Sequence, residues 1–447
     1  MEQQPRLPLW FLVVNWALIA VAFGLGFVLG GRRLADIPEP QRTALDLVHR
    51  TILESHVDPQ RAGDLIDRAI AGMVESLDPY SRYVPPSQVT QYEEANYGHY
   101  EGIGAEFRIT GDAVVVWFPL PGSPAEAAGL RPGDELIAVD GVPIGSASER
   151  NDTTKLVRGQ AGTDVRLTLR REGATLELTV RRGDVQKNCV KWSRFVDAEA
   201  GLGYLHLTDF HPRANQLVRD AIAELQQARP LRGLIVDLRF DGGGNLDECI
   251  ALARTFLPSG VIVTQRRRGS EEIERHEANA ADCLHPTLPL VLLVNEHSAS
   301  ASEVLAGALQ DHGRAAIVGV RTHGKAFVNT VYTWKDLDFR LKLTTGRYLT
   351  PNGHDIERNH GKGAAAKDTG GIAPDFEVVV DAAQKARIRD ALRDSEVPAP
   401  WRAAVATLAT RTGLVLPTGP QPALDAQLAR AIDALRTRVA AAPPEPR

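Results

Sequence analysis

Cysteine is scarce in this chain of 447 residues, and basic residues are not in excess. Three cysteines are too few for the disulfide framework of a small secreted domain, and they leave at least one thiol unpaired. The net charge is −5, and Lys and Arg are scattered among Asp and Glu, so no basic surface is predicted for a phosphate backbone. Nucleic acid is therefore not an expected partner.

Recognisable metal-binding spacing is also missing. His276, Cys283 and His285 lie close together in the sequence, but their spacing matches no familiar zinc pattern and is typical of an ordinary loop. We therefore expect no metal and no other cofactor. By contrast, 43% hydrophobic and 24% charged residues are enough for two or three globular cores, which argues against a disordered chain.

The N-terminus contains the one long apolar run. Residues 9–31 carry no charge and are long enough to cross a bilayer as a helix. A cleaved signal peptide usually has a shorter apolar core and a small-x-small cleavage site, so we favour an uncleaved anchor within residues 1–35. The charge rule does not decide the orientation, since Arg6 on one side is balanced by Arg32 and Arg33 on the other.

Four further regions follow the anchor. Residues 36–96 show helical periodicity, chiefly over residues 41–77, which indicates a helical hairpin that closes at a turn containing Asp78 and Pro79. Short alternating strands are predicted over residues 97–186, at 114–118, 136–139, 165–169 and 176–180. Residues 187–385 alternate apolar strands with helices, and residues 386–447 are largely helical. This tail is expected either to pack on the core or to mediate oligomerisation.

The stretch SPAEAAGLRPGD at residues 123–134, followed by Asp140-Gly141, resembles a PDZ domain. Such a domain holds a peptide as an added strand, with backbone amides of a Gly-rich loop receiving the terminal carboxylate. Gly102, Ile103 and Gly104 resemble that loop, although these glycines also suit a simple turn. Arg158 is either a charge facing the neighbouring domain or a solvated surface residue.

The α/β region has a glycine loop after its second predicted strand. The strands at residues 203–207, 234–238, 290–294 and 315–320 are nearly all apolar, which indicates a sheet covered on both faces. The loop DGGGN at residues 241–245 follows one of them, so its amides can converge on negative charge. Asp247 and Glu248 come next and would repel a phosphate, which favours an oxyanion hole.

A serine turn and a lysine complete the candidate site. The stretch SASASE at residues 298–303 follows an apolar strand and begins a helix, which suits an exposed nucleophile, although serines there also serve as caps or packing residues. Lys325 follows the next strand, and burial would lower its pKa enough for it to act as a general base. Together with the glycine loop, these residues provide nucleophile, base and oxyanion donors for acyl transfer.

These motifs resemble the carboxyl-terminal processing peptidases, a membrane-associated or secreted family of tail-specific serine-lysine endopeptidases with an embedded PDZ domain. The resemblance covers about residues 41–380 and implies a crotonase/ClpP-like α/β core with an inserted PDZ domain, itself a partly open β-barrel, and an N-terminal helical region. The matching stretches are LDPYS at residues 77–81, the PDZ segment, DLR at 237–239, the glycine loop, residues 298–303, GK at 324–325, YLTPNG at 348–353 and GIAPD at 371–375.

The resemblance implies a role for each matching residue. Ser300, the middle serine of its motif, would be the nucleophile, and Lys325 the general base. Ala301 and Gly243 would give the oxyanion amides, Gly243 being preferred to Gly244. Glu303 is expected to support the turn rather than react.

The chain departs from the family pattern near its lysine and in its glycine loop. Asn329, one methylene shorter, stands where the family has a lysine-orienting glutamine. Ala326 replaces the glycine after the lysine. Asp241 and Gly242 replace an asparagine and a proline in the loop. The dyad residues themselves are retained.

The family also implies partners and a location. Protein or peptide substrates with exposed C-terminal tails are expected, along with a regulatory partner or a homo-oligomer. The expected location is the cell inner membrane, with a single membrane pass and the protease domain on the periplasmic side.

Two alternative functions remain open from the sequence. One is a serine-histidine hydrolase using His297 or His323, which both lie in the motifs. The other is a catalytically impaired, membrane-tethered PDZ adaptor, which the shorter Asn329 favours.

Overall fold

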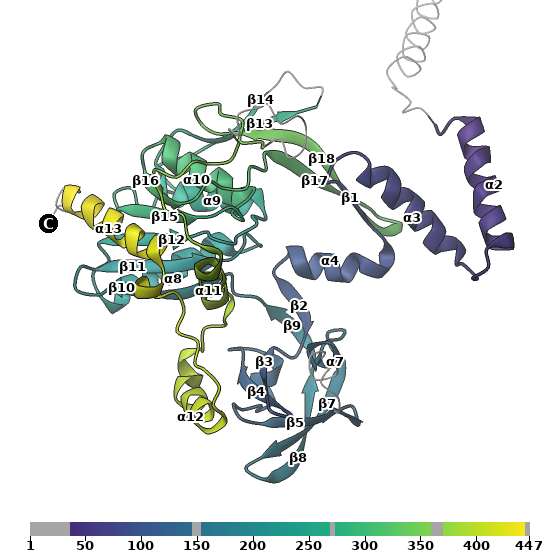
Figure 1. Cartoon of the computed structure of the whole chain (residues 1–447), viewed down its shortest axis with the longest axis horizontal. Helices are drawn as coiled ribbons and strands as arrows, with labels where there is room; N and C mark the ends of the chain where they lie inside the picture. Colours follow the sequence, from purple (N-terminus) through teal and green to yellow (C-terminus); the bar gives the residue numbers. More distant parts are fainter. Residues whose placement is uncertain (1–35, 145–152, 269–272, 359–369, 443–447) are drawn as a thin grey trace, which may run out of the picture. The chain divides into compact units, whose positions relative to one another are not determined.

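The structure, a computed structural model, describes residues 36–144, 153–268, 273–358 and 370–442 (Figure 1). The chain divides into two compact units, Met1–Ser76 and Leu77–Arg447, and each is described by itself. Every helix within the described ranges is too short or too polar to span a bilayer. The anchor predicted at residues 9–31 lies outside those ranges and stays a prediction.

The first unit contains the two helices predicted from the periodicity of residues 41–77. These are α2 (Glu39–Ser55) and α3 (Ala62–Glu75). Pro40 occupies the first turn of α2, where its missing N–H removes no hydrogen bond. Apolar side chains of both helices are exposed, including Val48 and Met73.

The inserted β domain contains all four strands predicted for it. Its elements are β2 (His99–Gly102), β3 (Ala105–Thr110), β4 (Ala113–Pro119), α5 (Pro124–Ala127), β5 (Glu135–Val139), β6 (Val142–Pro143), α7 (Thr153–Val157), β7 (Asp164–Arg171), β8 (Ala174–Arg181) and β9 (Gly183–Gln186). The sheet follows the open path β3-β4-β5-β7-β8, so β3 is an edge strand. Alternate residues of β7, namely Val165, Leu167 and Leu169, are buried in the domain core, as a half-buried strand requires.

A six-stranded sheet forms the centre of the α/β core, in the order β10-β11-β12-β15-β16-β19. Its elements are β10 (Val190–Asp197), β11 (Leu202–Leu207), α8 (Ala214–Ala228), β12 (Gly233–Asp237), α9 (Leu246–Phe256), β15 (Leu290–Val294), α10 (Ala301–Asp311), β16 (Ala315–Gly319), β19 (Phe376–Glu377) and α13 (Ala426–Ala441). All neighbouring pairs are parallel except β10 and β11.

Both faces of this sheet are covered, which explains why its strands are apolar throughout. Leu290 and Leu292 of β15 belong to the same buried cluster as side chains of α8, α9 and α10. Val291 and Leu293 belong instead to the cluster formed with α13. The predicted α/β class is therefore confirmed, and the carboxyl ends of β12, β15 and β16 lead into the three predicted motifs.

A second sheet, in the order β1-β18-β13-β14 with β17 paired to β18, borders the core. Its strands are β1 (Arg82–Val84), β13 (Val261–Arg267), β14 (Ile273–Glu277), β17 (Phe327–Trp334) and β18 (Leu337–Leu349). The short helices η1 (Pro86–Gln88) and α4 (Val89–Asn96) follow β1.

Asp78 stabilises the turn before β1, because its carboxylate accepts the N–H groups of Tyr80 and Ser81 at 2.8 Å. Thr344 of β18 also donates its hydroxyl to Asp78, at 3.0 Å.

The C-terminal tail packs on the folded domains. Besides α13, it contains α11 (Ala382–Arg393), η2 (Ala399–Trp401), α12 (Arg402–Thr412) and η3 (Pro422–Leu424). Val405 and Leu408 of α12 are buried in one cluster with Trp117 and Phe118 of β4. The helix α12 thus packs on the inserted β domain, while α13 packs on the central sheet of the core, as one of the two roles predicted for the tail requires.

A buried ion network attaches α13 to the core. Arg239, fully buried after β12, pairs with Asp237 at 2.6 Å and with Asp425 at 2.8 Å. Asp425 also caps α13 by accepting the N–H of Leu428 at 3.0 Å. A buried guanidinium with two carboxylate partners is sensitive to the loss of either one.

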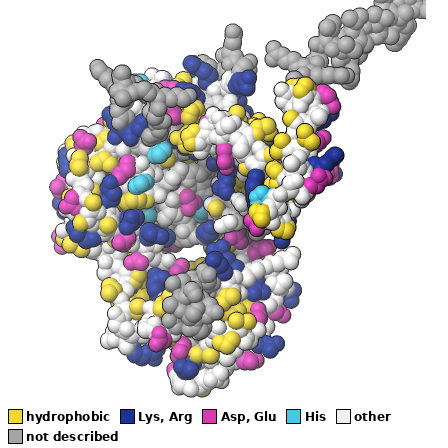
Figure 2. Space-filling view, turned by 45° about the vertical axis from the view of Figure 1, so that its right-hand side comes forward, with side chains coloured by type: hydrophobic (Ala, Val, Ile, Leu, Met, Phe, Trp, Pro, Cys, Tyr) yellow, Lys and Arg dark blue, Asp and Glu magenta, His cyan; other side chains and the backbone are white. Residues whose placement is uncertain are grey.

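The surface carries both signs of charge side by side. Figure 2 shows acidic and basic side chains interspersed over the visible face of the molecule.

Asp425→Ala is expected to lower the free energy of unfolding by about 3–5 kcal/mol, because Arg239 would stay buried with one carboxylate fewer. Urea unfolding followed by circular dichroism measures this change. The control is Asp433→Ala, in the same helix, where an exposed pair with Arg436 should contribute at most about 0.5 kcal/mol. Equal effects of the two substitutions would contradict the structural role of the network.

Candidate functional site

The turn between β15 and α10 holds Ser300 in an unusual backbone conformation. Its φ of 56° and ψ of −114° lie outside the common regions for residues with a side chain, and such conformations cluster at functional sites. Ser298 holds the turn, because its hydroxyl donates to the Leu238 carbonyl at 2.8 Å and accepts the Asn295 N–H at 3.0 Å. Ser298 is therefore a packing residue, whereas Ser300 is half-buried at the start of α10.

The glycine loop between β12 and α9 lies directly against this turn. The Ala299 N–H and the Ser302 hydroxyl both donate to the Asp241 carbonyl at 3.0 Å. A Cβ atom at Gly243 would lie 2.6 Å from the Ala299 carbonyl oxygen and 2.8 Å from the Ala301 nitrogen, and the φ of +93° likewise requires glycine. In this conformation the Gly243 N–H donates to the Asp241 carboxyl at 2.8 Å.

Asp241 is the loop residue that replaces the family's asparagine. It is fully buried, and this burial raises the pKa of Asp241 well above its usual range. One carboxyl oxygen of Asp241 accepts the Gly243 N–H, and the other has no hydrogen-bond partner among the described residues. Asp241 thus accepts a hydrogen bond that the carbonyl oxygen of an asparagine side chain could also accept.

Lys325 follows the loop after β16, and its Nζ lies 5.0 Å from the centre of the Tyr80 ring. Burial and the positive charge of Lys342 lower the pKa of Lys325 to about 8, against the opposing effect of the Glu303 and Glu357 carboxylates. Because an unperturbed lysine has a pKa near 10.4, a much larger fraction of this amine is neutral at mildly alkaline pH. A neutral amine can accept a proton.

One buried carboxylate joins the serine turn to the lysine loop. Glu303, in the first turn of α10, accepts the N–H groups of Ser300 and Lys325, both at 2.9 Å. It also accepts the Thr322 hydroxyl and the Gly324 N–H, both at 2.6 Å. These four bonds agree with the prediction that Glu303 supports the turn.

Ser300 and Lys325 line the same cavity, which has a volume of about 400 Å³. Its walls come from the glycine loop, α4, β17 and β18, and they include Gly243 and Asn329. The structure thus brings together the serine, the lysine, the glycine loop and the amide residue that the sequence predicted separately.

Neither His297 nor His323 is among the residues that line this cavity. The exposed His297 ring stacks on Phe240 with 5.3 Å between ring centres. The backbone N–H of His323 donates to the Ser298 carbonyl at 3.0 Å. The geometry therefore gives no support to a serine-histidine arrangement.

Asn329 belongs to a chain of hydrogen bonds across the β17–β18 hairpin. Its amide donates to the Thr344 hydroxyl at 3.1 Å, and that hydroxyl donates to Asp78 at 3.0 Å. The side chain is therefore held in place beside the cavity. Its role in orienting Lys325 stays a prediction.

Tyr80, Lys342 and Asp78 surround Lys325 but were not singled out as site residues from the sequence. Lys342 lies opposite Val331 in the long β17–β18 hairpin, a register that no local pattern reveals. Tyr80 and Asp78 belong to the LDPYS stretch that carries part of the family resemblance. That stretch was the one available signal for them.

The predicted carboxylate loop of the β domain leads into the edge strand β3. Gly102 pairs with Gly183 in β9, and Ile103 is buried, with its carbonyl accepting the Ala125 N–H at 2.8 Å. Gly104 has a φ of +74°, so a glycine is favoured there. An edge strand beside such a loop can accept an added peptide strand.

Arg158, which follows α7, pairs with Glu94 of α4, although 40% of its side chain stays exposed. Its Nη1 lies 2.8 Å from Glu94 Oε2, and its guanidinium lies over the Tyr100 ring at 4.7 Å. Of the two interpretations given to Arg158, the structure favours a charge that faces the neighbouring domain.

The residues considered for a metal from the sequence have separate contacts. His276 lies 2.6 Å from the Gln265 amide, and the Cys283 thiol donates to the Thr255 carbonyl at 3.8 Å. Within the described part of the chain, these two residues and His285 do not form a group with metal-binding spacing.

Comparison with protein families matches residues 201–378 to peptidase family S41 and residues 119–171 to the PDZ domain. A probable CtpA-like serine protease of Staphylococcus haemolyticus is 31% identical over 362 residues, which cover 81% of this chain and 70% of the relative. A carboxy-terminal-processing protease of Bartonella bacilliformis is 36% identical over 298 residues, which cover 66% of this chain and 67% of the relative.

Among solved structures, the photosystem II D1 C-terminal processing protease is similar, with 30% identity over 76% of this chain and 94% of that one. The TM-score of that superposition is 0.42.

Glu303→Gln is expected to lower the free energy of unfolding by about 1–3 kcal/mol, because an amide N–H would face backbone donors that now bind a carboxylate. Thermal or urea unfolding measures the change. Glu224→Gln, on the exposed face of α8, is the matched control and should have little effect. Unchanged stability in both variants would contradict the role assigned to Glu303.

Proposed function

The chain belongs to peptidase family S41, among the carboxy-terminal-processing serine proteases, and we propose that Ser300 is its nucleophile and Lys325 its general base. One observation carries this assignment: a half-buried lysine with a pKa of about 8 lines the same cavity as a serine in a strained turn. A lowered lysine pKa is what a serine-lysine mechanism needs near neutral pH.

In the proposed mechanism, neutral Lys325 takes the hydroxyl proton as Ser300 Oγ attacks the substrate carbonyl. The tetrahedral intermediate then collapses, and the Lys325 ammonium gives its proton to the departing amine. Water attacks the resulting ester with Lys325 again as base. The acid product leaves, and Ser300 recovers its proton.

The oxyanion is assigned to the backbone N–H groups of Ala301 and Gly243. Ala301 begins α10, whose positive end favours an anion. Gly243 lies against the same turn, but its N–H donates to Asp241 in the present conformation. Full oxyanion binding therefore requires the loop to turn this N–H toward the cavity, as happens when a catalytic site tightens around substrate.

The proposed substrates are proteins with exposed, apolar C-terminal tails. The edge strand β3 and the Gly102–Gly104 loop are suited to add the tail as a strand and to bind its carboxylate. The proposal also places the protein in the cell inner membrane through residues 9–31, with the protease domain on the periplasmic side, as the family resemblance implies.

Ser300→Ala and Lys325→Met should each reduce cleavage of an unfolded test protein, reduced and carboxymethylated α-lactalbumin, by about 10³-fold or more, since dyad members act as a unit. Product formation is followed by mass spectrometry. His297→Ala and Lys335→Met, which alter an exposed histidine and an exposed lysine outside the cavity, should retain activity. Equal cleavage by the wild type and Ser300→Ala would refute the assignment.

Lys342→Gln should move the alkaline rise in kcat/KM to higher pH, because Lys342 helps to lower the pKa of Lys325. Lys325 must be neutral to act as a base, so kcat/KM rises as the pH passes the Lys325 pKa, which is about 8 in the wild type. Removing the positive charge of Lys342 raises this pKa and therefore moves the rise to higher pH. Lys335→Gln, in the turn of the same hairpin, should leave the profile unchanged. A shift to lower pH, or no shift, would contradict the electrostatic role of Lys342.

A further inference from the structure

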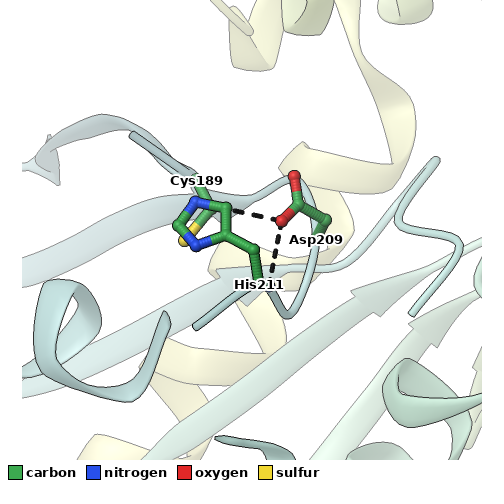
Figure 3. A group of neighbouring side chains, drawn as sticks. All are labelled: Cys189, Asp209 and His211. Carbon is green, nitrogen blue, oxygen red and sulfur yellow. Dashed lines mark hydrogen bonds and ion pairs between the residues drawn. The ribbon is translucent and has the colours of Figure 1, made fainter. Parts of the chain in front are cut away.

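A second group of side chains lies outside the cavity, where the chain leaves the β domain and enters the core. Cys189 stands just before β10, and Asp209 and His211 follow β11 (Figure 3). One ligand atom from each residue lies within 4.8 Å of the other two. Cys189 and His211 are buried, whereas Asp209 is half-exposed.

The His211 ring has a buried nitrogen that lacks a hydrogen-bond partner. Its Nδ1 lies 2.8 Å from the Pro212 carbonyl oxygen, which can only accept, so Nδ1 carries the proton. In the neutral imidazole the lone pair is then on Nε2, and no described residue hydrogen-bonds to this atom. It lies 4.0 Å from Asp209 Oδ1. A backbone carbonyl on one ring nitrogen and a free lone pair on the other is typical of a metal-binding histidine.

The same residue types also form cysteine-histidine catalytic sites, but this geometry does not suit one. Such a site needs the carboxylate on the histidine Nδ1, whereas Nδ1 is bonded to Pro212. The Asp209 Oδ1 atom accepts the backbone N–H of His211 at 3.0 Å instead. In addition, the Cys189 side chain is 1% exposed and cannot reach a peptide substrate.

We propose that Cys189, Asp209 and His211 bind one zinc-class divalent metal ion. Thiolate, imidazole and carboxylate are the three ligand types that zinc takes in proteins. Tetrahedral ligand atoms about 2.0–2.3 Å from zinc are roughly 3.5 Å from one another. The ligand atoms of this group lie within 4.8 Å of one another, so metal binding would shorten these distances by up to about 1 Å. Water at the exposed side, beside Asp209, completes the coordination.

The proposed metal would join segments that meet behind the glycine loop. Phe210, between two of the ligands, donates its N–H to the Gly243 carbonyl at 3.1 Å and accepts the Asn245 N–H. The His211 ring also fills the space beside Gly98, where a Cβ atom would lie 2.2 Å from the ring. Metal binding here does not depend on the role of Ser300 or Lys325.

The test is a Co²⁺ titration of the full chain carrying Ser300→Ala, which prevents self-cleavage, after treatment with a chelator. We expect one Co²⁺ per chain, a thiolate-to-cobalt charge-transfer band, and displacement by Zn²⁺. Cys189→Ser should abolish the band, and His211→Ala and Asp209→Asn should weaken binding by about tenfold or more. Cys283→Ser and His285→Ala, the matched controls, should bind as the parent does.

Circular dichroism establishes that each variant is folded. If Cys189→Ser or His211→Ala does not fold, metal binding is tested by comparing the parent protein with Asp209→Asn. This variant is altered at the half-exposed ligand. Zn²⁺ should then raise the Tm of the parent and have a smaller effect on Asp209→Asn, because a ligand that binds the folded state stabilises it. The proposal fails if the folded parent binds no Co²⁺ saturably, or if the charge-transfer band survives in Cys189→Ser.

Discussion

The candidate site depends on the buried carboxylate of Glu303. Its two oxygens accept four donors from two backbone segments, the start of α10 and the loop after β16. A carboxylate without these donors would be costly to bury, so both segments are held in the one arrangement that satisfies it. The positive end of α10 stabilises the same negative charge. The positions of Ser300 and Lys325 are thereby coupled, although they belong to different elements of the core.

The chemistry of Lys325 reflects a balance between opposing effects. Burial and Lys342 lower its pKa, while Glu303, Glu357 and Asp78 raise it. The carboxylate that positions the lysine loop thus also limits how far the amine is neutralised. The net result of these opposing effects is a pKa of about 8 for Lys325.

Much of the fold was predictable because its signals are local. The strands β12, β15 and β16 are apolar along their whole length, and the glycine and serine motifs directly follow two of them. The position of Lys342 was not predictable, since it depends on the register of a long hairpin. The grouping of Cys189 with Asp209 was missed for the same reason: antiparallel pairing of Val190 with Leu207 brings them together.

The ion network of Arg239 links the order of synthesis to the completion of the core. Arg239 and the strand before it are made long before Asp425 and α13, which cover one face of the central sheet. Until α13 emerges, that apolar face is exposed and the guanidinium lacks one of its carboxylates. The strands β12, β15 and β16, which lead into the candidate site, depend on α13 to cover one of their two faces. A chain that stopped before Asp425 would therefore leave one face of the central sheet uncovered and Arg239 with Asp237 as its remaining carboxylate partner in this network.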